Sequence, residues 1–231
     1  MSDMKPVASF AAAAEDKLNR RFGILTGLAA EARLLRGAGT VCCAAADGQV
    51  ARRMMRDMIG SGITHAVSFG LCGGLEPGLP SGSIVIASHV AGLGMALDCN
   101  NALVAEMAAL LPGAQVGGIW GTDAAVAGVR DKAQLYRRSH CLAVDMESHI
   151  VAELAADARL PFIALRVVCD PAEFPLPPAA LVPLKRGGVP DMGSILRSLL
   201  RRPGQIGGML GLARHHHRAM RGLAEAASAI I

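Results

Sequence analysis

The sequence has 231 residues, a length that suits one α/β domain with a single hydrophobic core. Hydrophobic residues make up 52% of it and the formal net charge is only +4, so the charge gives no argument for binding nucleic acid. No uncharged apolar stretch reaches the roughly 18 residues that a membrane-spanning helix needs, and the six cysteines lack the C-x-x-C spacing of zinc or redox sites. We therefore expect a soluble cytoplasmic protein without signal peptide, metal site or nucleic-acid partner.

Strands and helices alternate through the first half of the chain. Residues 1–20 are predicted to form a lead-in arm or helix, and the organised fold begins with a short buried strand at 22–26. Further strands are predicted at 40–46, 64–70 and 83–90, and helices at 29–37 and 47–62. The third of the four strands is expected to end at the glycines of GLCGGLEPG, residues 70–78. This alternation indicates a central sheet with helices on its faces.

The second half continues the pattern and ends in helices. Strands are predicted at 114–121, 141–146 and 161–170, and helices at 101–113, 131–139 and 148–160. Residues 171–190, rich in proline, are expected to form an irregular loop, and residues 191–231 to hold two C-terminal helices. Helical spacing predicts one apolar face on the last helix: Ile206, Met209, Leu210, Ala213, His217, Met220 and Ala224. No repeat or linker marks a second domain, so we predict a single domain over residues 1–231.

Four predicted strands are followed by residues that a ligand can use. These are Glu31, the glycines from Gly70 to Gly74, the pair Met146 and Glu147, and Asp170. Because ligands bind at the carboxyl ends of strands in open α/β sheets, we expect these residues to converge. Taken singly, such an acid is more often a helix-dipole partner or a turn former, so only the convergence favours a site. The glycines lack G-x-G-x-x-G spacing, which disfavours a Rossmann oxidoreductase; they form a tight turn or let backbone N–H groups approach a sugar or phosphate.

Four segments in order carry a resemblance to a known family: GILTGLAAEARLL (23–35), HAVSFGLCGGLEPGLPSGSIVIA (65–87), AVDMES (143–148) and PFIALRVVCDPAE (161–173). Together they resemble the nucleoside phosphorylase and nucleosidase superfamily over most of residues 22–173. The style is nearest to the methylthioadenosine/adenosylhomocysteine nucleosidases and the hopanoid-associated (adenosylhopane) phosphorylases. The resemblance implies a nucleoside phosphorylase-like α/β fold, with a central mixed sheet in a three-layer α/β/α arrangement, and a homo-oligomer.

The resemblance gives roles to the residues at the strand ends. Asp170 stands at the position of the general acid that protonates purine N7, and Glu31 at that of the acid that activates water in the nucleosidases. Met146 matches the residue that packs against ribose, and Glu147 the glutamate that accepts hydrogen bonds from its hydroxyl groups. Since the departing purine gains negative charge, a buried and protonated Asp170 suits this chemistry.

The purine and phosphate sites depart from the family's pattern. Cys72, Gly73 and Asp145 are predicted to line the purine site with Asp170, but GTDAAV (121–126) has no aromatic residue to stack on the base. Many phosphorylases hold phosphate with an arginine and a serine near the glycine turn, where this chain has Ser68 and Leu71, and the serine before the general acid is Cys169. The residues that we predict to hold phosphate are Gly27, Arg33, Arg53, Ser68 and Gly70, with Arg52 as an alternative to Arg53.

The C-terminal segment is basic. Between Lys185 and Arg221 there are eight Lys or Arg residues and one acid, Asp191. The segment and the motif FPLPPAA (174–180) resemble the hopanoid-associated branch, whose substrate is a lipid carrying a nucleoside. A helix near 204–228 with arginines beside its apolar face suits docking on a membrane, although helices of this kind more often pack on the sheet. The adjacent histidines at 215–217 point in different directions on a helix, so we predict no metal site there.

Together with these observations, the resemblance implies phosphorolysis of the purine–ribose bond of an adenosyl-hopane in hopanoid biosynthesis, with release of adenine. Inorganic phosphate is the predicted co-substrate, and no cofactor is expected. The alternatives are a hydrolytic nucleosidase of the methylthioadenosine/adenosylhomocysteine type and a non-catalytic nucleoside-binding subunit. The partner is a small-molecule or lipid-linked nucleoside, and the cytoplasmic location leaves open peripheral contact of the C-terminal helices with the inner membrane face.

Overall fold

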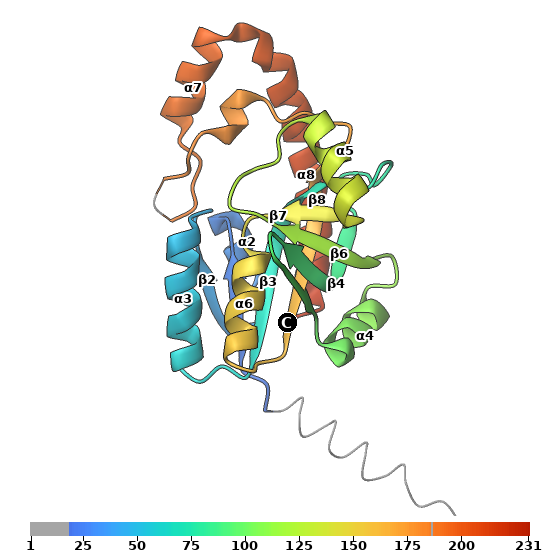
Figure 1. The fold of residues 1–231 in the computed structure, drawn as a ribbon. Helices are drawn as coiled ribbons and strands as arrows, with labels where there is room; N and C mark the ends of the chain where they lie inside the picture. Colours follow the sequence, from blue (N-terminus) through green and yellow to red (C-terminus); the bar gives the residue numbers. More distant parts are fainter. Residues whose placement is uncertain (1–18, 186) are drawn as a thin grey trace, which may run out of the picture.

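A computed structural model describes residues 19–185 and 187–231. In this part of the chain eight strands form one mixed sheet in the order β2-β1-β3-β7-β6-β4-β5, and β8 pairs with both β3 and β4 (Figure 1). The strands are β1 Phe22–Thr26, β2 Thr40–Cys43, β3 His65–Gly74, β4 Ile84–Gly92, β5 Met95–Asp98, β6 Gln115–Gly121, β7 Ala143–Asp145 and β8 Phe162–Asp170. The predicted lead-in arm or helix at 1–20 lies, up to residue 18, outside the described residues.

The long strands β3 and β4 change neighbours along their length. β3 runs parallel to β8 and pairs antiparallel with β7 at its last two residues, Gly73 and Gly74. β4 starts antiparallel to β8 and continues parallel to β6, which in turn pairs with β7. Strands β3, β7, β6, β4 and β8 therefore form a closed ring of pairings, which gathers the ends of several strands at one end of the sheet.

Strand β3 runs through the glycines that were expected to end it, so that prediction was wrong. Gly70 has a φ of +154°, and a Cβ atom there would lie 2.7 Å from Glu31 Oε2 and 2.8 Å from Arg166 Nη1. The glycine is required by the close approach of two charged side chains rather than by a turn. The sequence patterns also missed β5, a short strand that pairs antiparallel with β4.

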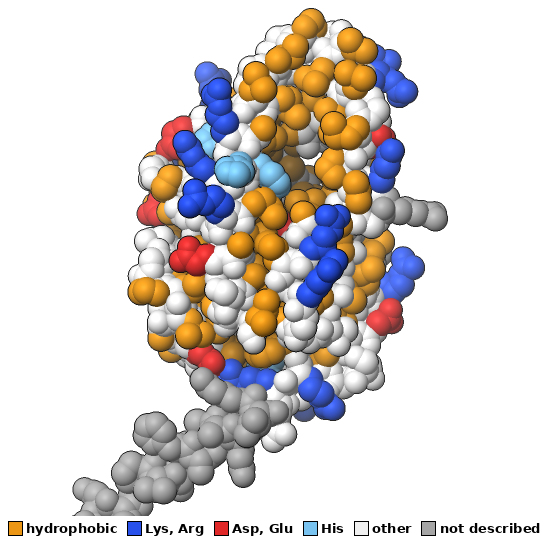
Figure 2. Space-filling model, turned by 180° about the vertical axis from the view of Figure 1, so that it is seen from behind, with side chains coloured by type: hydrophobic (Ala, Val, Ile, Leu, Met, Phe, Trp, Pro, Cys, Tyr) orange, Lys and Arg blue, Asp and Glu red, His pale blue; other side chains and the backbone are white. Residues whose placement is uncertain are grey.

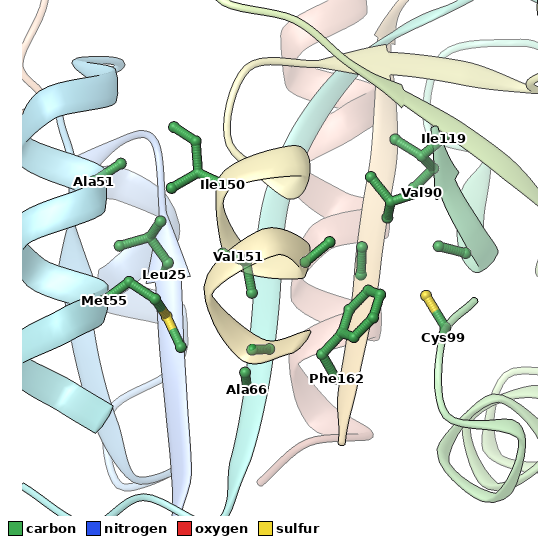
Figure 3. Close-up of a cluster of buried hydrophobic side chains, with 14 of the residues drawn as sticks. Leu25, Ala51, Met55, Ala66, Val90, Cys99, Ile119, Ile150, Val151 and Phe162 are labelled. Atoms are coloured by element: carbon green, nitrogen blue, oxygen red, sulfur yellow. The ribbon is translucent and has the colours of Figure 1, made fainter. Parts of the chain in front are cut away.

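Helices cover both faces of the sheet. They are α2 Ala29–Leu34, α3 Gly48–Gly60, α4 Asn101–Leu110, α5 Val129–Ser139, α6 Ser148–Asp157, α7 Met192–Arg201 and α8 Ile206–Ser228, with 3₁₀ turns η1 Pro178–Leu181 and η2 Pro203–Gln205. On one face α3 and α6 pack over a core that contains Leu25 and Met55 (Figure 3). On the other face Ile24 and Leu223 belong to a second core beneath α8. The alternation of Ile24 and Leu25 follows the strand pleat, and the predicted three-layer α/β/α fold is confirmed.

The lower half of α8 packs on the sheet mostly through small residues. Its buried positions are Ala219, Gly222, Leu223, Ala226 and Ala227. The apolar face predicted for this half was wrong, because His217 and Ala224 are exposed. A Cβ atom on Gly222 would lie 2.5 Å from the carbonyl oxygen of Gly82, so the helix approaches the backbone more closely than a pattern of large apolar residues indicates.

The upper half of α8 leaves the sheet and joins a cap at one end of the molecule (Figure 1). We define the cap as η1, α7, η2 and residues 206–216 of α8. The buried side chain of Gln205 ties these elements together, accepting a hydrogen bond from Ala179 N at 2.8 Å and donating to Ser198 O at 3.1 Å. The predicted loop at 171–190 therefore contains one short helical turn, and the two C-terminal helices occur where they were predicted.

Candidate active site

A pocket of about 460 Å³ lies between the strand ends and the cap. This volume falls in the range of small-molecule sites, roughly 300–1,000 Å³. Its floor is formed by residues at or just beyond the ends of five strands: Gly27 after β1, Cys72 and Gly73 of β3, Thr122 after β6, Asp145 of β7, and Cys169 and Asp170 of β8. The expected convergence of distant segments at the strand ends is therefore present in the structure.

Glu31 lies on this floor although it is almost fully buried. Its carboxylate accepts hydrogen bonds from three backbone N–H groups: Gly27 at 2.9 Å, Leu28 at 2.8 Å and Leu71 at 2.8 Å. Burial raises the pKa of Glu31, while Arg166 and these N–H groups act in the opposite direction. The carboxylate is thus held rigidly at the pocket wall, joined to both β1 and β3.

A buried arginine on β8 organises the other acids of the floor. Arg166 is fully buried and contacts Asp145 Oδ2 at 2.5 Å through Nη2 and Glu147 Oε2 at 3.3 Å through Nη1. Its guanidinium also donates to Ser68 Oγ at 2.5 Å and to Ser148 Oγ at 3.3 Å, and Ser148 bonds Asp145 in turn. Burial raises the pKa of Glu147 to about 7 despite the nearby arginine. The network orients Glu147 at the start of α6, where its carboxyl group lines the pocket.

Asp170 faces the pocket from the end of β8 and is paired with a buried lysine. Lys132 of α5 is fully buried, and its Nζ lies 2.6 Å from Asp170 Oδ2. The same ammonium group donates to the carbonyl oxygens of Asp170, Pro171 and Phe174 at 2.9–3.2 Å. Burial raises the pKa of Asp170, and Lys132 opposes this rise. Gly73 lets the carboxylate approach β3, because a Cβ atom there would lie 3.1 Å from Asp170 Oδ2.

The two thiols on the floor are kept protonated by burial. Burial raises the pKa of Cys169 to about 12 and that of Cys72 well above its ordinary value. Both cysteines therefore act as small apolar surfaces beside Asp170 rather than as nucleophiles.

The opposite wall of the pocket is apolar and comes from the cap and the segments that lead to it. Its apolar residues include Leu176, Ala179, Val182, Leu184, Ile195, Met209 and Leu212, and its titratable members are Asp191 and His216. Burial lowers the pKa of His216, which favours the neutral ring near pH 7. The pocket thus has an acidic floor and a larger apolar roof.

Most of the predicted site residues line this single pocket. They are Gly27, Glu31, Cys72, Gly73, Asp145, Met146, Glu147 and Asp170. Ser68 and Gly70 lie behind the floor, where Ser68 bonds Arg166 and Gly70 contacts the Glu31 side chain closely. Arg33 and Arg53 are exposed and do not line the pocket, and Arg52 pairs with Glu153 at 2.7 Å. The structure does not bring the arginines predicted for phosphate to the site, because they lie on the outer faces of their helices.

Two cations that control the floor were not predicted from the sequence. Arg166 is the single charged residue inside the apolar run FIALRVVC, and a charge in a strand buried on both faces signals a buried partner. Lys132 gave no such signal, because a lysine near a helix start is usually solvated; only the fold places it beside Asp170.

The described residues hold neither a cluster of metal ligands nor a helix that could span a membrane. Across residues 19–185 and 187–231, no three His, Cys, Asp or Glu side chains are grouped as metal ligands. In the same ranges, every helix is too short or too polar to cross a bilayer.

Comparison with known proteins gives a family and a fold. The model of the phosphorylase superfamily matches residues 34–181. No curated protein matches the sequence significantly. Among solved structures, the 5'-methylthioadenosine/S-adenosylhomocysteine nucleosidase of Neisseria meningitidis, in complex with methylthio-immucillin-A, has a TM-score of 0.68 at 16% identity, covering 91% of this chain and 98% of its own.

Two more solved structures show the same fold. The S-adenosylhomocysteine nucleosidase of Streptococcus pyogenes has a TM-score of 0.64 at 17% identity, covering 90% of this chain and 95% of its own. The futalosine hydrolase of Helicobacter pylori has a TM-score of 0.64 at 15% identity, covering 80% and 99%. At these identities the likeness establishes the fold, and the match of the family model ends at residue 181, where most of the cap begins.

Proposed function

The chain belongs to the phosphorylase superfamily, and on that premise we propose that it cleaves the N-glycosidic bond between a purine and a ribosyl group. The observation that carries the proposal is the placement of Asp170, Glu147 and Glu31 on the floor of one pocket. Burial raises the pKa of all three, a direction that suits carboxyl groups with a role in proton transfer.

In the proposed reaction Asp170 is the general acid. It donates a proton to N7 of the purine as the bond to C1' of the ribose breaks, so that the base leaves as a neutral molecule. Lys132 holds Oδ2, which leaves Oδ1 as the oxygen that we assign to the proton transfer. This carboxyl group is surrounded by the apolar or small groups of Cys72, Cys169 and Gly73. They exclude water, which would otherwise return the pKa of Asp170 toward its ordinary value.

The sugar is proposed to lie between Met146 and Glu147. The carboxyl group of Glu147 accepts hydrogen bonds from two ribose hydroxyls, and Arg166 holds it in place for that contact. Glu31 then faces C1' from the floor and positions the nucleophile that attacks it.

Two nucleophiles are compatible with this reaction, and one observation favours water. Phosphorolysis, the first prediction, brings a phosphate dianion to the pocket. Among its lining residues, drawn from the described part of the chain, none is Lys or Arg, and the nearby Arg166 already faces two carboxylates. An acidic floor without a free cation disfavours an anionic co-substrate, so hydrolysis with Glu31 as the water-activating base is the reading that the geometry supports best. Phosphorolysis remains the second candidate.

For the substrate we propose a nucleoside whose 5' substituent is large and apolar, such as an adenosyl-hopane. The support is the roof of the pocket, where Leu184, Ile195, Met209 and Leu212 offer an apolar wall far larger than a ribose needs. A small adenosine thioether is the alternative. The predicted homo-oligomer stays a prediction, which the mass in solution will test.

Measurement of adenine release tests the proposal directly. The protein is incubated with an adenine nucleoside in buffer with and without inorganic phosphate, and the sugar product is identified by mass spectrometry. Adenine release at equal rates in both buffers, with a free ribosyl product, supports hydrolysis. Release that requires phosphate and yields a ribosyl phosphate establishes phosphorolysis instead, and no release from any adenine nucleoside refutes the proposed activity.

A further inference from the structure

The outward face of the cap is unusually apolar. Twelve large hydrophobic side chains are exposed in residues 19–185 and 187–231, and seven of them lie between positions 181 and 210. They are Leu181, Val189, Met192, Leu196, Leu200, Ile206 and Leu210. Figure 2 shows hydrophobic side chains gathered at the cap end of the molecule, with Lys and Arg side chains to either side. Exposed apolar residues scattered singly need no explanation, but this concentration indicates a contact surface.

Helix α7 carries the centre of this surface. It buries none of its residues, and Met192, Leu196 and Leu200 are 68%, 58% and 75% exposed. Their spacing of four residues places them in one stripe along the helix, while Ile195 lines the pocket. The helix therefore has one apolar side toward the pocket and another that nothing in the described part of the chain covers.

The charges around the stripe are positive. Arg197, Arg201 and Arg202 are exposed beside Leu196 and Leu200. Asp191 is the single acid between Lys185 and Arg221, and it is engaged by the N-terminus of α7 and by Lys185 at 3.3 Å. A second copy of the chain would bring the same positive charge to this face, which disfavours self-association through it. A partner surface that combines an apolar layer with negative charge complements this face of the cap.

We propose that the cap docks on the surface of an anionic phospholipid bilayer. The stripe of Met192, Leu196 and Leu200, continued by Ile206 and Leu210, enters the boundary between headgroups and acyl chains, and the neighbouring arginines bind lipid phosphates. This differs from the docking helix expected from the sequence, since the lower half of α8 packs on the sheet and α7 takes its place.

The inference deepens the proposed function and rests on it in one respect. Ile195 and Met209 line the pocket from the same two helices whose outer sides carry the stripe. If the substrate is a lipid-linked nucleoside, docking brings the apolar roof of the pocket to the bilayer, and the lipid part moves from one apolar environment to another. The docking itself needs no substrate and is measured without one.

Vesicle flotation of the full chain tests the proposal. The protein is mixed with vesicles of phosphatidylcholine and phosphatidylglycerol, or of phosphatidylcholine alone, and the fraction that floats is measured. We expect the protein to float with the anionic vesicles, and added salt to reduce the floating fraction. With the neutral vesicles a much smaller fraction should float. Equal flotation with both would overturn the role of the arginines, and no flotation with anionic vesicles would overturn the docking.

Two pairs of variants locate the surface. Leu196→Gln with Leu200→Gln should remove most of the flotation, whereas Leu110→Gln, at an exposed leucine of α4 away from the cap, should not change it. Arg197→Gln with Arg201→Gln should lower the affinity for anionic vesicles about fivefold for each arginine. Arg36→Gln with Arg56→Gln removes the same charge outside the cap and should have a much smaller effect. Equal losses in both arginine pairs would mean that only net charge matters.

The activity assay keeps this proposal separate from the proposed function. Adenine release from a nucleoside in solution, without vesicles, should be the same in the wild type and in the Leu196→Gln, Leu200→Gln variant. A protein that floats but releases no adenine retains the docking surface and loses the proposed activity. Sedimentation of the same variant tests the alternative that a second copy of the chain covers the stripe. If the leucine substitutions break an oligomer and leave flotation unchanged, the stripe is a subunit interface and the proposal is wrong.

Discussion

The floor and the roof of the pocket are built from opposite kinds of residues. The floor lies at strand ends, its carboxylates are buried, and each is fixed by a cation or by backbone N–H groups. The roof lies in the cap, is apolar, and comes mostly from residues beyond the match of the family model at 34–181. In the proposed reaction the sheet supports the rigid, desolvated acids, whereas recognition of what the nucleoside carries is left to the cap, whose helix α7 buries none of its residues. Mutations in the two regions should therefore fail in different ways.

The largest expected effect is on the floor. Asp170→Asn removes the proton donor and keeps the shape, so the rate of adenine release should fall by about 10²–10⁴ while nucleoside binding stays nearly constant. The check combines steady-state kinetics with binding measured by calorimetry. Unchanged kcat would remove Asp170 from its role, and a loss of binding equal to the loss of rate would make it a binding residue instead.

The second effect concerns the cation beneath that acid. Lys132→Met leaves Asp170 without its partner and three carbonyl oxygens without a donor, which should lower the free energy of unfolding by about 3–5 kcal/mol. Because Lys132 opposes the rise in the pKa of Asp170, its removal should raise that pKa further. If protonated Asp170 is the acid, the basic limb of the pH profile of kcat should move to higher pH. A destabilised variant with an unmoved pH profile would leave Lys132 a structural role alone.

A third effect links the floor to pH. The pKa of Glu147 is raised from 4.5 to about 7 in the fold, so the folded state binds a proton more tightly than the unfolded chain in this range. The stabilisation is complete below pH 4.5 and is lost as the pH rises to 7. Glu147→Gln has no such dependence. The stability of this variant relative to wild type should rise between pH 5 and pH 8, on the order of 1–3 kcal/mol, as measured by denaturant unfolding. A constant difference would contradict the raised pKa.

The fourth effect belongs to the roof and is smaller. Ile195→Ala and Met209→Ala remove apolar surface from the pocket wall without touching the floor. Each should raise KM by roughly tenfold for an adenine nucleoside with a large apolar 5' group and leave the kinetics with adenosine unchanged. Equal changes for both substrates would show that the roof shapes the whole pocket rather than the subsite for the substituent.

The same division explains what could be predicted from the sequence. Glu31, Glu147 and Asp170 were found because each follows a strand whose apolar pattern is clear, and parallel strand ends meet by geometry. The roof was not found, because Ile195 and Met209 look like ordinary positions of amphipathic helices until the tertiary structure shows which side faces the pocket. Lys132 could not be predicted, because its position beside Asp170 depends on how α5 crosses the end of β8, and no local sequence pattern carries that information.

Substitution of the arginines that were predicted to hold phosphate has the smallest expected effect. It also tests whether the floor of one chain is the whole active site. Arg33 follows Glu31 by two positions on α2, which turns its side chain away from the pocket, and Arg53 lies on the exposed side of α3. Arg33→Gln and Arg53→Gln should leave adenine release within about twofold and stability within about 0.5 kcal/mol of wild type, with or without phosphate. A phosphate-dependent activity that either substitution abolishes would mean that another subunit's arginine completes the site, because neither residue reaches the pocket of its own chain. The floor would then be only part of the active site. Its lack of cations would mean that one chain holds an incomplete site, and it would no longer favour water as the nucleophile.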